Sequence, residues 1–188
     1  MANDESKPAP EPLIRVQSLV NTVELPDGDD LLANVANARA WLVDNHLLAR
    51  DVDLNDSDLE LVRGVREALR ALLVRNGGGP LPSEAALAPL RTVAARGVAL
   101  AEFDEDGDVQ LAAAGQSVPE RLLELVLILR DAQHDGSWAQ LKACANDECQ
   151  WAFYDRSRNH GGTWCEMSTC GNKLKNREFR ARRKAATR

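Results

Sequence analysis

Hydrophobic residues in the first 140 positions recur mostly at the spacing of helices. Leu31, Val35, Ala38 and Leu42 share one helical face, which predicts a helix over residues 31–43. The preceding stretch, residues 13–25, is apolar without a clear period, and we expect a short helix there. The first part of the chain is therefore expected to be rich in helix.

Three further helices are predicted from their end signals, which are capping residues, proline at a helix start and glycine at a helix end. The first helix begins after Ser57, with Glu60 as its capping partner, and ends at the Asn-Gly-Gly-Gly-Pro segment at 76–80. The second begins after Ser83 and runs to about Ala95. The third begins at Pro119 and is ended by Gly136. The helix that Pro119 opens is the most apolar and is expected to be the most buried.

The period changes between Gly97 and Gly115. Two apolar runs, 98–103 and 109–114, flank an acidic segment that contains Asp106-Gly107. An Asp-Gly pair between two such runs predicts a β-hairpin, because glycine adopts the positive φ that the turn needs.

Charge divides the chain into two unlike parts. The 188 residues carry a net charge of −6, yet residues 1–140 hold 12 Lys and Arg against 24 Asp and Glu, and residues 141–188 hold 11 against 5. Such asymmetry is typical of an acidic body that carries an anion-binding appendage. We therefore expect a Pro-rich disordered tail over 1–12, a body over 13–138 and a second module over 139–188.

The composition argues against a membrane protein or a secreted one. The longest apolar run, Leu122–Leu129, is interrupted by Glu124 and is too short to span a bilayer. The first residues contain acids and prolines instead of an apolar signal segment. A cytoplasmic location is expected.

All four cysteines lie within one 27-residue window, as Cys144, Cys149, Cys165 and Cys170. Two Cys-x4-Cys pairs in a reducing compartment favour one tetrahedral site for Zn²⁺, which soft thiolates select. Two disulfides or four unlinked thiols are the alternatives. The overall class is then α+β: a mainly helical body with a β-hairpin, followed by a small four-cysteine zinc finger made of a short β-hairpin and a basic helix.

The finger contains candidate groups for nucleic-acid contact. A β-prone aromatic run over 150–155 leads into a polar loop over 156–162, which turns the chain back toward Cys165. A helix is expected from Cys170 to about Ala186 with a cationic stripe along it. The candidates for contact with phosphates or base edges are Arg156, Arg158, Asn159, Asn172, Lys173, Lys175, Arg177, Arg180, Arg182, Arg183 and Lys184.

Trp151, Phe153 and Tyr154 have two interpretations, base stacking or a small core beside the metal, and the core is the commoner role for aromatics at such sites. His160 is interpreted as a loop residue, because four thiolates already complete a zinc site.

These motifs resemble a known pair of domains. Residues 142–177, with Cys-Ala-Asn-Asp-Glu-Cys, Asp-Arg-Ser-Arg-Asn at 155–159 and Cys-Gly-Asn at 170–172, are similar to the CGNR zinc finger. The body resembles the ABATE domain through Asn21-Thr22, Trp41-Leu42 and the segment from Arg63 to Ala68. The resemblance implies four cysteine ligands to one zinc ion and a bacterial stress-induced transcription regulator that binds DNA.

The sequence departs from the family pattern at several points. Lys173 stands where the family's naming tetrapeptide has arginine, which keeps the charge and loses the bidentate guanidinium. Gly162-Thr163 stand where arginines are usual, and Ser18-Leu19 replace Asp-Phe before the Asn-Thr pair. The first two changes weaken the expected phosphate contacts, and the third leaves the role of Asn21 open.

The sequence therefore predicts a DNA-binding transcription regulator with one structural zinc ion and no enzymatic activity, since no catalytic set of Ser, His, Asp or Cys can be assembled. A homodimer is expected to strengthen the weak binding of a single finger. The alternative is a protein-interaction or small-molecule-sensing module whose finger is only structural. Asn21 and Thr22 are candidates for a ligand pocket, with buried hydrogen bonding as their other interpretation.

Overall fold

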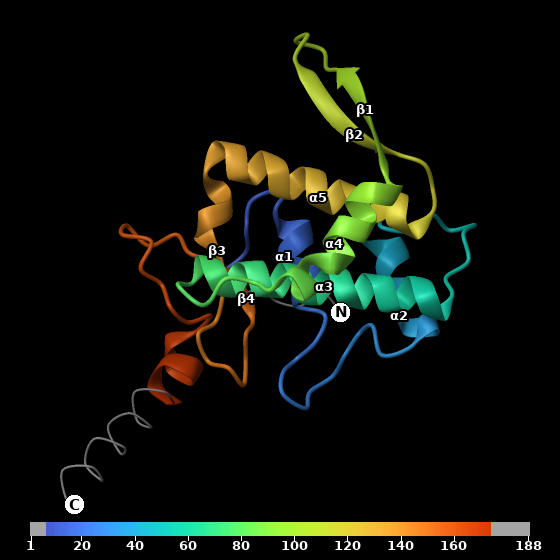
Figure 1. The fold of residues 1–188 in the computed structure, drawn as a ribbon. Helices are drawn as coiled ribbons and strands as arrows, with labels where there is room; N and C mark the ends of the chain where they lie inside the picture. The colour runs from blue at the N-terminus through green and yellow to red at the C-terminus, as the bar shows by residue number, and fades with distance from the viewer. Residues whose placement is uncertain (1–6, 174–188) are drawn as a thin grey trace, which may run out of the picture.

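A computed structural model describes residues 7–173 (Figure 1). Five α-helices and two β-hairpins make up most of its regular structure, which confirms the α+β class. The helices are α1 Ile14–Val20, α2 Val35–Asp44, α3 Asp56–Asn76, α4 Glu84–Arg96 and α5 Val118–Asp135. The hairpins pair β1 Val98–Phe103 with β2 Val109–Ala114, and β3 Leu141–Ala143 with β4 Ala152–Tyr154.

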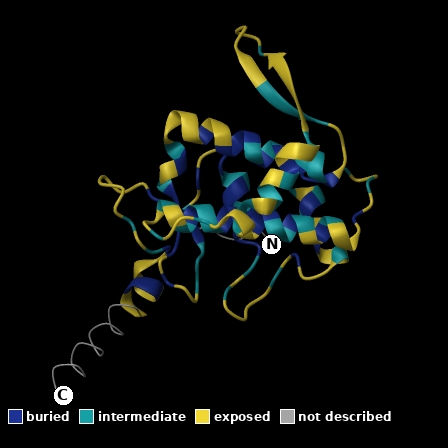
Figure 2. Cartoon of the chain, in the orientation of Figure 1, coloured by how far each residue is buried: buried dark blue, intermediate teal, exposed yellow. Residues whose placement is uncertain are grey.

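The body is built around α3, the longest of these helices. Figure 1 shows α5 running beside it with α1 between them, and Figure 2 shows the buried faces of all three turned inward. Val62 and Leu69 of α3 and Leu122 and Leu125 of α5 are fully buried. Burial of each such side chain contributes about 1.5–3 kcal/mol to the stability of the body. Among residues 7–173, no helix combines the length and hydropathy that crossing a membrane requires.

Two predicted helix starts differ from the structure. The helix expected from residue 31 begins at Val35, because the Asn34 side chain accepts a hydrogen bond from the N–H of Asn37. The capping box of α3 is formed by Asn55 and Asp58 instead of Ser57 and Glu60. Asparagine and aspartate satisfy the same free N–H groups as serine and glutamate, so either spacing was chemically adequate.

Other end signals act as predicted. The Ser83 side chain accepts from the N–H of Ala86 and begins α4, which continues through Pro89 to Arg96. Gly136 ends α5 in the left-handed conformation, with φ of 83°. Gly107 provides the positive φ of the β1–β2 turn, with φ of 86°. This hairpin projects away from the helices in Figure 1.

The second hairpin belongs to the body's core. Leu141, Ala143, Ala152 and Tyr154 pack in the same hydrophobic cluster as α3 and α5. Asn76, at the end of α3, donates through its amide to the carbonyls of Trp138 and Leu141, at 2.8 and 2.9 Å. The expected boundary between residues 138 and 139 therefore does not separate two cores.

The free edge of β4 is covered by α1 and by the N-terminal segment. The Asn21 amide donates to the carbonyl of Ala152 at 3.0 Å and accepts from its N–H at 2.7 Å. Gln17 donates to the same carbonyl at 3.2 Å. Two residues along the strand, the N–H of Tyr154 donates to the carbonyl of Lys7 at 2.9 Å. These bonds satisfy backbone groups that an edge strand otherwise leaves open.

The predicted disordered tail is wrong for residues 7–12. Besides the contact between Lys7 and Tyr154, the N–H of Ala9 donates to the Gln17 side chain at 2.7 Å, and Ala9 is buried. Composition suggested disorder because the segment is rich in proline, whereas its order comes from hydrogen bonds to α1 and β4. Residues 1–6 lie outside the described residues.

We predict that Asn21→Ala lowers the free energy of unfolding of the zinc-loaded protein by about 2–3 kcal/mol, because it removes the side-chain partner of the Ala152 N–H. Asn37→Ala, at an exposed position in α2, is the control and should change it by less than about 0.5 kcal/mol. Urea denaturation followed by circular dichroism measures both. Equal midpoints for the two variants would contradict this role of Asn21.

Candidate metal centre

The four cysteines converge from separate segments of the finger. Cys144 follows β3, Cys149 precedes β4, and Cys165 and Cys170 are brought together by a π-helical turn over Met167–Gly171. Their sulfur atoms all lie within 4.8 Å of one another. The Sγ–Sγ distance is 3.8 Å between Cys149 and Cys165 and 3.9 Å between Cys165 and Cys170.

These distances fit a tetrahedral zinc ion. With Zn–S bonds of about 2.3 Å, the sulfurs of a regular tetrahedron lie about 3.8 Å apart. A disulfide needs an S–S distance of about 2.05 Å, so neither short pair is bonded, and all four thiols are free. Four sulfur ligands complete the coordination of one ion, and zinc here is structural: it fixes the chain segments that hold it.

Hydrogen bonds between the closely spaced thiols shift the pKa values of the cysteines. Contacts with the Cys149 and Cys165 thiols lower the pKa of Cys144, whereas the contact with Cys144 raises the pKa of Cys149. The same neighbours raise the pKa of Cys165. Four thiolates this close repel one another strongly, so they ionise together only around a cation such as Zn²⁺.

Asn146 supports the centre from inside the first Cys-x4-Cys loop. Its side-chain amide is buried and donates to the Cys170 sulfur at 3.6 Å, and its backbone N–H bonds to Cys144. Its carbonyl accepts from the N–H groups of Cys149 and Gln150, which closes the loop. Donors of this kind offset the negative charge of a thiolate site and orient its ligands.

Aromatic residues form the core around the sulfurs. Phe153 is 1% exposed and packs with Cys144, Cys165 and Cys170, while Trp151 and Trp164 lie partly buried against the same cluster. The Lys7 ammonium lies 4.8 Å from the centre of the Phe153 ring and donates to the Trp164 carbonyl at 2.9 Å. Phe153 therefore has the core role, and the N-terminal segment covers the finger.

A buried ion pair holds the polar loop over 156–162. Lys142 of β3 donates to Asp155 Oδ2 at 2.8 Å and also to the carbonyl of His160. The N–H groups of Gly162, at 2.6 Å, and Ser157, at 3.0 Å, also donate to the Asp155 carboxylate. Burial acts to raise the pKa of Asp155, but the bonds from Lys142, Ser157 and Gly162 outweigh it and hold the pKa well below its usual range. The loop is thus tied at both ends to one charged carboxylate.

The predicted contact residues fall into three groups. Arg156, Arg158 and Asn159 are exposed on the loop that Asp155 holds, and Arg156 also donates to the carbonyl of Pro8 at 3.0 Å. Asn172 and Lys173 are exposed beyond the π-helical turn, where Lys173 pairs with Glu148 at 2.8 Å. The remaining candidates lie outside the described residues, and they are Lys175, Arg177, Arg180, Arg182, Arg183 and Lys184.

The start of the last helix also differs from prediction. Helical structure begins at Met167, three residues before the expected start at Cys170, and its first turn is of the π type. The wider turn carries the Cys170 sulfur to the metal site, and a π turn is frequent at functional sites. The predicted continuation to Ala186 lies outside the described residues beyond Lys173.

Asn21 and Thr22 are engaged in buried hydrogen bonds. Asn21 binds Ala152 as described above, and Thr22 donates to the carbonyl of Leu19 at 2.9 Å while accepting from Arg66. Both residues are at most 2% exposed. Both residues therefore act as buried hydrogen-bonding residues, which was the other interpretation besides a ligand pocket.

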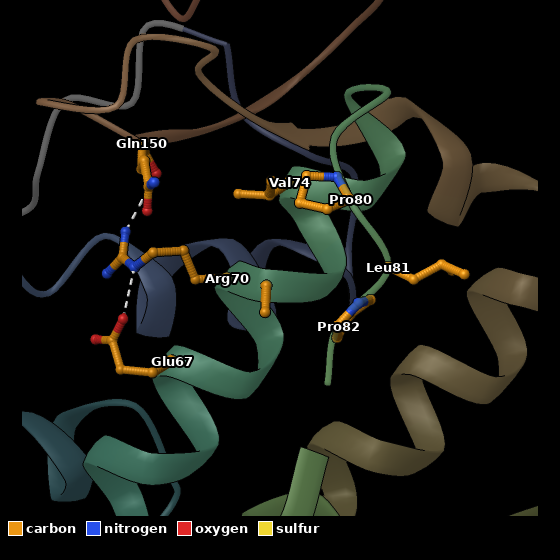
Figure 3. Close-up of a pocket in the computed structure, with 8 residues that line it drawn as sticks. Glu67, Arg70, Val74, Pro80, Leu81, Pro82 and Gln150 are labelled. Carbon is orange, nitrogen blue, oxygen red and sulfur yellow. Dashed lines mark hydrogen bonds and ion pairs between the residues drawn. The ribbon is translucent and has the colours of Figure 1, made fainter. Parts of the chain in front are cut away.

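An ionic network runs from the body to the finger. Arg66 bonds to Asp30 at 2.7 Å and to Glu67 at 2.8 Å, and the other oxygen of Glu67 accepts from Arg70 at 2.9 Å. Arg70 is 3% exposed and donates to the carbonyl of Gln150, next to the zinc ligand Cys149, at 3.1 Å (Figure 3). The buried guanidinium of Arg70 therefore links the body to the loop that contains Cys149.

A pocket lies beside this network. It has a volume of about 240 Å³ and opens between α3, the segment that precedes α4, and the finger. Figure 3 shows Glu67 and Arg70 on one side and the Pro80–Pro82 segment on the other. The residues that line it are Glu67, Arg70, Ala71, Val74, Pro80, Leu81, Pro82 and Gln150.

Sequence reasoning missed Lys142, Asn146, Asp155 and Arg70 as residues that position the site. Asp155 stands in the Asp-Arg-Ser-Arg-Asn motif, which was a usable signal. Asn146 likewise stands in the Cys-Ala-Asn-Asp-Glu-Cys segment. Lys142 and Arg70 are charged residues with partners elsewhere in the chain, and no local pattern distinguishes them from exposed ones.

The fold and the sulfur cluster define a zinc-finger protein whose finger is joined to a helical body. Residues 140–183 match the family model described as "CGNR zinc finger". Residues 15–134, well over half of the chain, match the model "Putative stress-induced transcription regulator", the ABATE family, and the chain belongs to that family. No curated protein matches the chain.

Metal analysis of the wild-type protein should give about one zinc ion per chain, and Cys→Ser at any of the four ligands should abolish tight binding. Because β3 and β4 also pack in the body, zinc removal by a chelator should lower the melting temperature of the helices as well as change the near-ultraviolet dichroism of Trp151 and Trp164. Met167→Leu, in the same turn, should retain zinc. Unchanged zinc content in all four Cys→Ser variants would refute the assignment.

A double-mutant cycle tests the ion pair under the loop. Lys142→Met should destabilise the protein by about 3–5 kcal/mol, because it leaves a buried carboxylate without its cation. Adding Asp155→Asn should recover part of that loss, so the two changes should be less than additive. The contribution of Asp155 should be complete above the ordinary aspartate pKa of about 3.9 and be lost as the pH falls through its lowered folded value. Additive effects in urea denaturation at neutral pH would contradict the pairing.

Proposed function

We propose that this protein regulates transcription by binding DNA through its finger. Membership of a family of transcription regulators supports the regulatory role. The observation that carries the DNA-binding role is the loop held by the Asp155 carboxylate, on which Arg156, Arg158 and Asn159 are exposed. Arginine on a fixed loop is suited to phosphate, because its guanidinium is planar and always charged.

The basic C-terminal segment extends the proposed interface. The last eighteen residues contain eight Lys and Arg against the single acid Glu178. Loop and segment together would dock on phosphates, and Asn172 or Asn159 would reach base edges. The acidic body would repel DNA elsewhere, which orients the finger toward it.

We further propose that zinc does no chemistry in this protein and that the chain is not an enzyme. Four cysteine ligands leave no coordination position for water or substrate, which is the mark of a structural site. The proposed setting is the cytoplasm of a bacterium under stress, as the resemblance to the family implies.

A small-molecule-sensing role is the second candidate, and the pocket beside Arg70 favours it. A ligand there would touch both α3 and Gln150, which adjoins a zinc ligand. Under this hypothesis the finger is a structural clasp, and intact protein would not bind DNA.

Binding of the zinc-loaded protein to a duplex should weaken steeply with salt, because phosphate contacts release counterions. Arg156→Ala with Arg158→Ala should reduce the slope of log K against log salt by about 2, since each lost phosphate contact accounts for about 0.9. Arg50→Ala with Arg91→Ala, two exposed arginines of the body, removes the same charge and should leave the slope nearly unchanged.

Fluorescence anisotropy with a labelled duplex measures both double variants. No binding of wild-type protein at low salt would refute the proposal and leave the sensing role as the better candidate. Equal slopes for the two double variants would show that the loop is not the interface.

A further inference from the structure

The β1 strand is an exposed edge with an apolar sequence. All six of its residues are exposed, including Val98 at 53%, Leu100 at 50% and Phe103 at 73%. Figure 2 shows this hairpin largely in the colour of exposed residues. The hairpin projects away from the helices. Within residues 7–173, β2 is the only strand that pairs with β1.

Of the two hairpin edges, that of β1 faces away from the body. Leu111 and Ala113 of β2 are half-buried against the main core, whereas no residue of β1 is buried. The outer backbone groups of β1 therefore face solvent.

Soluble proteins normally protect such an edge with lysine, proline, a bulge or a very short strand. The strand β1 reads Val-Ala-Leu-Ala-Glu-Phe, with Glu102 as its one charge, and pairs with β2 in a regular register over six residues. Apart from the charge of Glu102 it lacks these protective features, so its edge is open to pairing with another strand.

We propose that the β1 edges of two copies of this chain pair antiparallel around a two-fold axis, which gives a dimer with one four-stranded sheet. A strand in antiparallel pairing with its own copy satisfies both sets of outer backbone groups by symmetry. With the axis at Leu100 or Ala101, Glu102 lies opposite Val98 or Leu100 of the second copy, and no like charges face each other.

Charge complementarity supports this arrangement. Arg96 ends α4, and Gly97 continues in extended conformation into β1. The same axis places Arg96 opposite Asp104 or Asp106 in the acidic turn of the second copy, and symmetry makes this contact twice. The two acidic turns lie at opposite ends of the joint sheet and so do not repel each other at close range.

The side chains at the hairpin end also fit. Phe103 would lie opposite Gly97 or Ala99 of the second copy, and these small residues leave room for its ring. Covering exposed phenylalanine and leucine removes apolar surface from water, which favours association.

The test is the mass of the full-length, zinc-loaded protein in solution, measured without DNA by sedimentation equilibrium from low to high micromolar concentration. The wild type should have twice the chain mass of 20.6 kDa. Leu100→Lys should be monomeric with an unchanged helical spectrum and zinc content. Leu81→Lys, another exposed leucine at 75%, is the matched control and should stay dimeric.

A charge swap tests the pairing separately and keeps it testable if Leu100→Lys fails to fold. Arg96→Glu should raise the dimer dissociation constant about tenfold or more, because two attractive contacts become repulsive. With the axis at Ala101, which puts Asp106 opposite Arg96, Asp106→Arg alone should do the same, and the double variant should restore dimerisation. Asp106 is used because Asp104 accepts the hydrogen bonds of the turn.

A wild-type mass of 20.6 kDa at every concentration would overturn the proposal, including the case in which a strand of another protein covers β1. A dimer unaffected by both Leu100→Lys and Arg96→Glu would also overturn it. The result is independent of DNA binding, which the finger variants test.

Discussion

The two hydrogen bonds between Asn21 and Ala152 join the beginning of the body to the strand that follows a zinc ligand. The Asn21 amide pairs with Ala152 as a neighbouring strand would, since it offers one donor and one acceptor to the backbone. Because this contact closes the edge of β4, the hairpin can lie in the core without open backbone groups. The positions of Cys144 and Cys149, in the loop that joins β3 to β4, then follow.

The polar residues inside the molecule serve this same junction. Arg70 holds the carbonyls of Val20 and Gln150, and Lys142 holds Asp155 and the loop behind it. Burying such charges is unfavourable unless each finds its partners, and here the partners are backbone carbonyls and carboxylates of distant segments. Two further arginines of the body pair with its own carboxylates: Arg15 with Glu124 and Arg66 with Asp30. The surplus of positive charge is left to the finger.

Local signals in the sequence predicted much of the structure. The cap at Ser83, the Asp-Gly turn of the β1–β2 hairpin and Gly136 at the end of α5 each act through neighbours within a few residues, so a short window contains the necessary information. The cysteine spacing predicted the metal centre because tetrahedral coordination restricts what four clustered thiols can do. Contacts between distant segments were not predictable in this way. Asn21 and Ala152 are separated by 131 positions, and a polar residue with a remote partner looks like an exposed one.

The same reason explains the error over residues 7–12. Prolines and a lysine in a terminal segment are usual in disordered tails, and the groups that order this one lie on α1 and β4. The segment 156–162 was expected to be a polar loop, and it is one. Its position depends on hydrogen bonds to the Asp155 carboxylate, which the loop pattern alone does not predict.

The shared hairpin has a consequence for how this protein can be inherited and engineered. The two family models divide the chain between residues 134 and 140, as if the finger were a cassette that recombination moves freely. A gene fragment cut there takes Leu141 and Ala152 with it and leaves α3 and α5 with part of their core missing. Transplanted alone, the finger would also lack Asn21 and Lys7. A finger moved without its own body is therefore expected to fold poorly, and body and finger are expected to be inherited together.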